Sequence, residues 1–162
     1  MATVFLLVGL TGAGKTTYSE RVLRPTGATR LSVDKIVFAR QGRYDVDYPA
    51  AVYFEHYTPA LAEVRSAMLR ELDLGHDVAL DLGIWGRADR DDWKALIESA
   101  GARWRLLYFR VPRAELLRRL VERNQLEHAN ALRVTEKDLD DFYSRFDEPH
   151  GEGEEVIEPN SY

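Results

Sequence analysis

The sequence contains no cysteine, and this absence excludes disulfide bonds, thiolate zinc sites and cysteine nucleophiles together. It also lacks a long hydrophobic run, since the apolar stretch at residues 4–10 is far too short to span a bilayer. No basic leader with a cleavage site accompanies that stretch. We therefore expect a cytoplasmic protein with no membrane partner.

The chain has no large excess of charge of either sign, with 22 Lys and Arg residues against 27 Asp and Glu and a net charge of −5. This acidic balance argues against broad, nonspecific binding to nucleic-acid phosphates, although it leaves room for a local basic pocket. The 162 residues, of which 45% are hydrophobic, suit a single domain over 1–162 that buries a real core. The oligomeric state stays open.

Short apolar segments alternate with helical patterns along the whole chain. Residues 3–8 are continuously apolar after Thr3, as a strand buried on both faces requires, and Gly9 ends them. Further strands are expected at 30–33, 77–82, 104–111 and 155–157. Apolar residues spaced three and four apart between 61 and 72 predict one of the intervening helices. This alternation predicts an α/β fold with a mainly parallel sheet covered on both faces.

The strongest motif follows the first strand. Residues 9–16 read Gly-Leu-Thr-Gly-Ala-Gly-Lys-Thr, which is the full phosphate-loop pattern, and they open a helix expected at 15–23. Backbone N–H groups of such a loop surround phosphate oxygens, and the helix N-terminus adds partial positive charge. Lys15 is placed to reach the β- and γ-phosphates of ATP, and the Thr16 hydroxyl to bind Mg²⁺. The expected nucleotide-binding residues of the loop are Gly9, Thr11, Gly12, Ala13, Gly14, Lys15, Thr16 and Thr17.

Two aspartates end later strands at the edge where parallel-sheet enzymes place their chemistry. Asp34 follows the strand at 30–33 and is either a general base for a substrate hydroxyl or the N-cap of a helix at 35–40. Asp81 ends the strand at 77–82 and is expected to support Mg²⁺ with Thr16, or to hold the acceptor.

Arginines and aromatic residues complete the candidate site. Arg87 and Arg90 follow Asp81. They either contact a phosphate or the substrate, or lie on a solvated helix face. Arg119 and Arg123 share one helix face at the start of a polar segment, 119–134, that suits a lid closing over ATP, although a charged helix is also simply solvated. The aromatic stretch within 41–60, with Tyr53 and Tyr57, is a candidate acceptor wall or plain packing.

Taken in order, these segments resemble the small P-loop kinases of the AAA-like group, which include chloramphenicol phosphotransferase, zeta-toxin-like kinases and polynucleotide kinases. The resemblance rests on residues 9–16, Asp34, 80–90 and 116–124 and spans nearly the whole chain. It implies a P-loop NTPase fold with three α/β/α layers, a central five-stranded sheet and a lid. It also implies ATP on the loop, the acceptor near Asp34 acting as base, and one lid arginine towards the base with the other towards the phosphates.

We therefore expect an ATP- and Mg²⁺-dependent kinase that phosphorylates a hydroxyl of a small molecule, such as an antibiotic, a nucleoside or a sugar-like compound. Two alternatives are a 5′-hydroxyl polynucleotide kinase, for which only Arg40 and Arg43 offer nearby positive charge, and an ATP-binding or resistance protein without catalysis. Nucleic acid is the less favoured partner. The expected catalytic residues are Asp34, Lys15 and Arg123, the metal ligands Thr16 and Asp81, and the substrate-binding residues Asp34, Asp81, Arg87, Arg90, Tyr53 and Tyr57.

Overall fold

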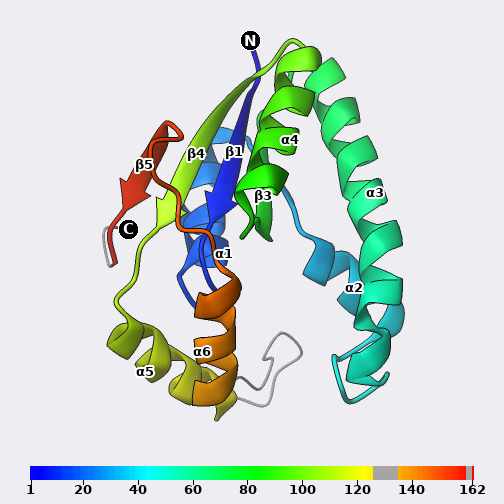
Figure 1. Cartoon of the computed structure of the whole chain (residues 1–162). Helices are drawn as coiled ribbons and strands as arrows, with labels where there is room; N and C mark the ends of the chain where they lie inside the picture. Colours follow the sequence, from blue (N-terminus) through cyan, green and yellow to red (C-terminus); the bar gives the residue numbers. More distant parts are fainter. Residues whose placement is uncertain (126–134, 160–161) are drawn as a thin grey trace.

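The computed structural model describes residues 1–125, 135–159 and 162 (Figure 1). Its elements in chain order are β1 (Thr3–Val8), α1 (Lys15–Tyr18), η1 (Ser19–Leu23), η2 (Arg24–Thr26), β2 (Thr29–Leu31), α2 (Val33–Gln41), η3 (Ala50–Val52), α3 (Tyr53–Asp73), β3 (Val78–Gly83), α4 (Arg87–Ser99), β4 (Arg103–Phe109), α5 (Arg113–Asn124), α6 (Glu136–Arg145) and β5 (Glu154–Ile157). The expected lid begins within α5, and its part at 126–134 lies outside the described residues.

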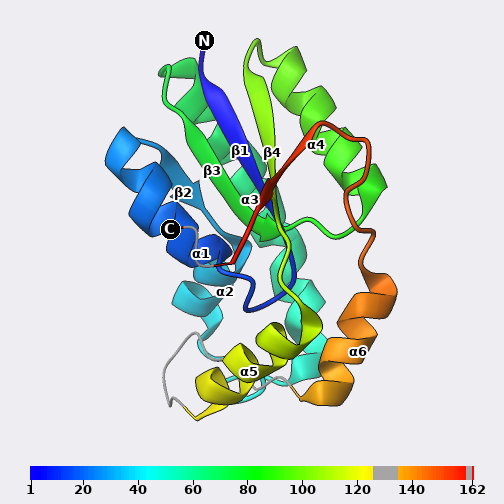
Figure 2. The same ribbon diagram turned by 90° about the vertical axis from the view of Figure 1, so that its left-hand side faces the viewer.

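The strands form one sheet in the order β2-β3-β1-β4-β5, and every pairing is parallel (Figure 2). The five-stranded parallel sheet expected from the sequence is therefore confirmed, with strand ends that differ from the expected ones by up to two residues. β1 lies at the centre because its side chains are buried on both faces, which agrees with its continuous apolar sequence. The register between β1 and β3 shifts after Leu7, which pairs with Asp81, so that Val8 pairs with Gly83.

Helices cover both faces of the sheet. On one face, Val4 and Leu6 of β1 pack in the same cluster as Val64 of α3 and Ile97 of α4. On the other face, Phe5 and Leu7 pack with Leu23 of η1 and with buried leucines of α5 and α6. Figure 1 shows α5 and α6 lying beyond the carboxyl ends of the strands. The result is a three-layer arrangement with two hydrophobic cores.

The chain leaves the sheet on opposite faces after β1 and β3. The connection from β1 to β2 runs through α1 and η1, which pack on one face, whereas the connection from β3 to β4 runs through α4 on the other. The neighbouring carboxyl ends of β1 and β3 are therefore a topological switch point, where open α/β sheets bind their ligands. The loop at 9–16 and Asp81 both lie there.

Two helices differ in detail from the sequence interpretation. The helix after the loop begins at Lys15 and ends at Leu23 as expected, but it changes from α to π geometry at Ser19. The next helix begins at Val33, and Ser32 caps it by accepting a hydrogen bond from the Lys35 N–H at 3.3 Å. None of the helices that the structure describes is both long and apolar enough to cross a membrane.

Candidate active site

The loop at 9–16 curls at the end of β1 with two glycines in the left-handed region. Gly12 has a φ of 86° and Gly14 a φ of 98°, conformations that side chains with a Cβ rarely adopt. The Lys15 Nζ donates to the carbonyl oxygens of Gly9 and Leu10, both at 2.9 Å. Within the same loop Thr11 is half-buried and Ala13 is buried, and Thr17 just after it is exposed. The lysine therefore lies folded against its own loop.

Three charged groups lie near Lys15. Burial lowers the pKa of its ammonium group, while the carboxylates of Asp81 and Asp34 oppose this shift and the Arg123 guanidinium reinforces it. The loop, the end of β3, the first turn of α2 and the last turn of α5 thus bring their charges into one region. All of the residues that the sequence analysis named as catalytic are among them.

Asp81 is held by two side chains at the carboxyl end of β3. Its Oδ2 accepts a hydrogen bond from the Thr16 hydroxyl at 2.8 Å, so the two residues expected to hold the metal lie side by side. The same oxygen also accepts from Arg30 Nε at 3.0 Å and Nη2 at 2.8 Å. Arg30 was not predicted as a site residue, because in the sequence it shows only as a charged residue in a short strand. Knowing that β2 pairs with β3 would have revealed it, because Arg30 pairs with Ala79 and so shares a face with Asp81.

The oxygens of Thr16 and Asp81 fit Mg²⁺ by their chemistry. Mg²⁺ prefers oxygen ligands and is usually held by one or two protein groups together with substrate phosphates and water. Among the described residues there is no cluster of three or more His, Cys, Asp or Glu side chains that would form an all-protein metal site. The donor set therefore suits a cation carried by a nucleotide.

Asp34 lies in the first turn of α2, and its partner comes from α3. Because Ser32 caps the helix, the N-cap interpretation of Asp34 is wrong, and the carboxylate points to another partner: its Oδ1 accepts a hydrogen bond from the Tyr53 hydroxyl at 2.6 Å. Burial, and then the charge of Asp34, raise the pKa of Tyr53 well above its usual value, so the phenol stays protonated and donates. Tyr53 is half-buried, whereas Asp34 is exposed.

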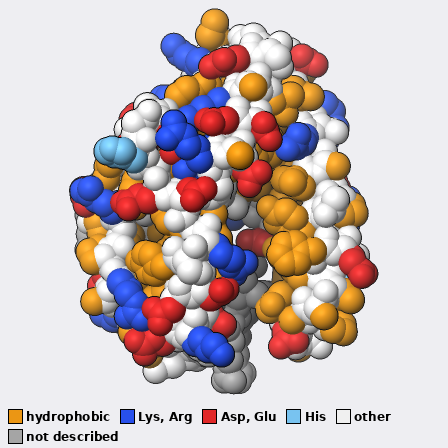
Figure 3. All heavy atoms as spheres, in the orientation of Figure 1, with side chains coloured by type: hydrophobic (Ala, Val, Ile, Leu, Met, Phe, Trp, Pro, Cys, Tyr) orange, Lys and Arg blue, Asp and Glu red, His pale blue; other side chains and the backbone are white. Residues whose placement is uncertain are grey.

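Aromatic rings surround this pair. The Tyr53 ring has its centroid 5.4 Å from that of Tyr44 and 5.8 Å from that of Tyr57. Burial, followed by the charge of Asp34, raises the pKa of Tyr57 as well, which places Tyr57 in the field of the same carboxylate. Figure 3 shows a hollow between α6 and the side formed by α2 and α3, with hydrophobic side chains along the α3 wall. The rings thus pack with one another and also border the carboxylate.

The two arginines of α5 differ in their surroundings. Arg119 turns to the loop, where its Nη1 donates to the Gly12 carbonyl at 3.3 Å while its Nε donates to Glu115 at 3.0 Å. Burial lowers the pKa of Arg123, and the charge of Asp34 opposes that shift. One arginine therefore contacts the phosphate loop and the other lies in the field of Asp34.

Tyr162, which was not singled out from the sequence, also reaches the loop and donates to the Gly14 carbonyl at 3.2 Å.

Arg90 does not reach the site. Its side chain is 0% exposed and forms hydrogen bonds through Nε and Nη2 to both carboxylate oxygens of Glu152, at 2.9 and 2.8 Å. Its Nη1 donates to the carbonyls of Ile84 and Trp85. The expected substrate contact is therefore corrected to a structural one, since no donor of Arg90 points to solvent. Arg87 is exposed at the start of α4, and its backbone N–H donates to Asp147 at 3.2 Å.

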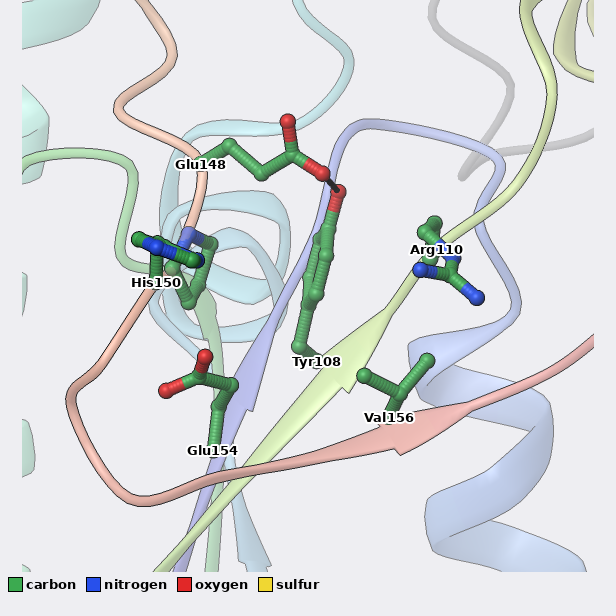
Figure 4. A pocket seen from close by; sticks show the side chains of 7 residues that line it. Tyr108, Arg110, Glu148, His150, Glu154 and Val156 are labelled. Atoms are coloured by element: carbon green, nitrogen blue, oxygen red, sulfur yellow. Dashed lines mark hydrogen bonds between the residues drawn. The ribbon is translucent and has the colours of Figure 1, made fainter.

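A second hollow, of about 270 Å³, lies beside the β4–β5 edge (Figure 4). It is lined by Tyr108, Arg110, Glu148, Pro149, His150, Glu154 and Val156. Its carboxylates are engaged within the protein: Glu148 accepts from the Tyr108 hydroxyl at 2.8 Å, and Glu154 accepts from the backbone N–H groups of Gly151 and Glu152. None of the residues expected in the active site borders this hollow, and the Glu154 hydrogen bonds close the turn that leads into β5.

Comparisons with known proteins agree with this architecture. A family profile described as an AAA domain matches residues 4–149, whereas no curated protein matches the sequence. A Chloroflexus aurantiacus protein of known crystal structure superposes with a TM-score of 0.76 at 15% identity, covering 97% of this chain and 88% of that one. For a gluconokinase from Sinorhizobium meliloti the TM-score is 0.64 at 15% identity, with 99% and 83% covered.

A third structure, Chaetomium thermophilum Kti12 in complex with ADP-AlF3, superposes with a TM-score of 0.69 at 17% identity, covering 97% of this chain and 89% of that one. At these identities the likeness shows the fold alone. The three-layer P-loop NTPase fold expected from the resemblance to small P-loop kinases is therefore confirmed.

Proposed function

Because the chain belongs to the AAA domain family, we propose that it is an ATP- and Mg²⁺-dependent kinase that phosphorylates a hydroxyl of a small molecule, such as an antibiotic, a nucleoside or a sugar-like compound. The observation that carries this proposal is the phosphate loop itself, whose Thr16 hydroxyl lies 2.8 Å from Asp81 and whose Lys15 lies in the field of Asp34. An exposed carboxylate that also acts on the phosphate-loop lysine is suited to work on an acceptor beside a bound phosphate.

The phosphate side of the site is formed by the loop. Bound ATP with Mg²⁺ supplies the phosphoryl group and neutralises charge on the phosphates. The loop N–H groups and the α1 N-terminus bind the phosphates, and Lys15 exchanges its carbonyl partners for phosphate oxygens. Thr16 and Asp81 are the residues that would hold the cation.

The acceptor side is formed by α2 and α3. Tyr53 holds Oδ1 of Asp34 and so fixes the orientation of the carboxylate. Asp34 takes the proton of the acceptor hydroxyl as the hydroxyl oxygen bonds to the γ-phosphorus, and the bond between that phosphorus and the ADP oxygen breaks. Arg119 and Arg123 supply positive charge from the loop side and the base side of the transferred group.

The polynucleotide alternative is less favoured. The basic residues near the acceptor side that would meet a nucleic-acid phosphate are already paired: Arg40 with Glu63 at 2.5 Å and Arg43 with Asp47 at 3.2 Å. Exposed pairs of this kind are weak, so they reduce the positive charge offered without abolishing it. An oligonucleotide therefore belongs in the acceptor panel as a competitor of the small molecules.

The test is a mass-spectrometric screen for an added phosphoryl group, with ATP and Mg²⁺, over nucleosides, antibiotics, sugars and a 5′-hydroxyl oligonucleotide. We expect a phosphorylated small molecule that requires both Lys15 and Asp34. Rapid phosphorylation of the oligonucleotide, with a steep loss of rate in salt, would instead support the polynucleotide alternative. Tight ATP binding with no product from any acceptor would support a protein without catalysis.

A further inference from the structure

Arg30 forms hydrogen bonds with the carboxylate of Asp81, which is one of the two groups proposed to bind Mg²⁺. Its Nε and Nη2 both bind Oδ2 of Asp81, and its Nη2 lies 3.4 Å from the Thr16 hydroxyl oxygen. The side chains of Arg30 and Asp81 are only 19% and 5% exposed. A positive charge of the protein itself therefore lies beside the two residues expected to hold Mg²⁺.

The position of this guanidinium is fixed by the sheet. Arg30 is the middle residue of β2 and pairs with Ala79, two residues before Asp81 on the neighbouring strand. Side chains two residues apart on a strand share a face, so Arg30 and Asp81 are neighbours by strand register rather than by the path of a loop. Paired strands on both sides therefore place the guanidinium close to the carboxylate.

The ion pair changes what a cation meets at this site. Three hydrogen bonds from two side chains converge on Oδ2, and the guanidinium offsets the charge of the carboxylate. A divalent cation approaching Thr16 and Asp81 also meets the repulsion of Arg30, which is strong at low exposure because solvent screens it little. The phosphates of a nucleotide counter that repulsion because they add negative charge and oxygen ligands at the same place.

Building on the proposed function, we propose that Arg30 is an internal competitor of the divalent cation. Paired with Asp81, it prevents free Mg²⁺ from binding in the absence of nucleotide, so that the cation enters only together with the phosphates. The observation that carries this inference is the pair of hydrogen bonds from Arg30 Nε and Nη2 to Oδ2 of Asp81, the oxygen that also accepts from the Thr16 hydroxyl.

The test is calorimetric titration of nucleotide-free protein with Mn²⁺ alone. Arg30→Gln removes the charge and keeps a polar side chain, so we expect it to bind Mn²⁺ at least about tenfold more tightly than the unaltered protein. Arg30→Lys keeps a charge and should bind as weakly as the unaltered protein. Arg24→Gln is the matched control, because Arg24 forms an exposed pair with Glu20 away from the loop, and it should leave Mn²⁺ binding unchanged.

Equal or weaker Mn²⁺ binding by Arg30→Gln, with its fold verified by circular dichroism, would overturn the inference. If that variant does not fold, the unaltered protein decides: Mn²⁺ alone should leave its thermal midpoint unchanged, and Mn²⁺ with ADP should raise it. Stabilisation by Mn²⁺ alone would overturn the proposal. Neither measurement needs turnover, so failure of the kinase proposal is recognised separately by the acceptor screen.

Discussion

The Tyr53 hydroxyl lies 2.6 Å from Oδ1 of Asp34, although the two residues are 19 positions apart and belong to different helices. A raised pKa keeps the phenol protonated at neutral pH, so Tyr53 is a donor to the proposed base. The contact joins the start of α3 to the first turn of α2 and connects the aromatic wall to the chemistry. Tyr53, which was expected from the sequence to contact the substrate, therefore also holds the carboxylate of the proposed base.

Replacing Tyr53 with Phe should lower kcat by about tenfold, because a hydrogen bond to a charged group of roughly 1.5–3 kcal/mol no longer orients the carboxylate. ATP affinity should not change. The control is Tyr44→Phe, whose ring packs on Tyr53 but lies 40% exposed. A Tyr53→Phe enzyme with unchanged kcat and a raised KM for the acceptor would assign Tyr53 to binding alone.

Lys15→Ala should greatly weaken productive use of ATP, since the ammonium group is the loop's only side-chain cation. The comparison is Lys137→Ala, an exposed lysine on α6. Both variants are assayed for ATP binding and for phosphoryl transfer. A normal rate for Lys15→Ala would contradict the assignment of the loop.

Glu152→Gln should destabilise the protein by about 3–5 kcal/mol, because it leaves the buried Arg90 charge without its counter-charge. Glu155→Gln, which alters the exposed pair with Arg105, should cost less than about 1 kcal/mol. Urea unfolding measures both changes. Similar small losses would show that the Arg90–Glu152 pair does not hold the loop before β5.

The same pair predicts a pH dependence of stability. Burial raises the pKa of Glu152, but the hydrogen bonds and charge of Arg90 outweigh it, so the net pKa is lowered. A carboxyl group whose pKa is lower in the folded state than in the unfolded state stabilises the protein at pH values above its unfolded-state pKa. This stabilisation is lost as the pH falls through the folded-state pKa. The difference in the free energy of unfolding between the unaltered protein and Glu152→Gln should therefore decrease as the pH falls from neutral to about pH 3. A constant difference would contradict this.

The sequence was sufficient for features that depend on local pattern. Continuous apolarity located β1, and the glycine spacing located the phosphate loop together with the helix that follows it. What it could not supply were contacts between segments. Arg30 and Arg90 look alike as isolated charges, and only the strand register and the packing of the loop before β5 reveal that one faces Asp81 and the other is buried.

Asp34 illustrates the same limit on a smaller scale. Asp and Ser are both good helix caps, so the stretch of Ser32, Val33 and Asp34 allowed two helix starts. The backbone chooses Ser32, and this choice leaves the Asp34 carboxylate available for Tyr53. Propensity alone does not distinguish the two starts, because both residue types are favoured caps.

The most direct test of the proposed chemistry is phosphoryl transfer by Asp34→Asn to whichever acceptor the screen identifies, with ATP binding measured on the same sample. We expect unchanged ATP binding and a rate reduced by at least about 100-fold, the usual effect of removing a general base. Asp73→Asn, an exposed change at the far end of α3, should behave as the unaltered protein. A near-normal rate for Asp34→Asn would contradict the account.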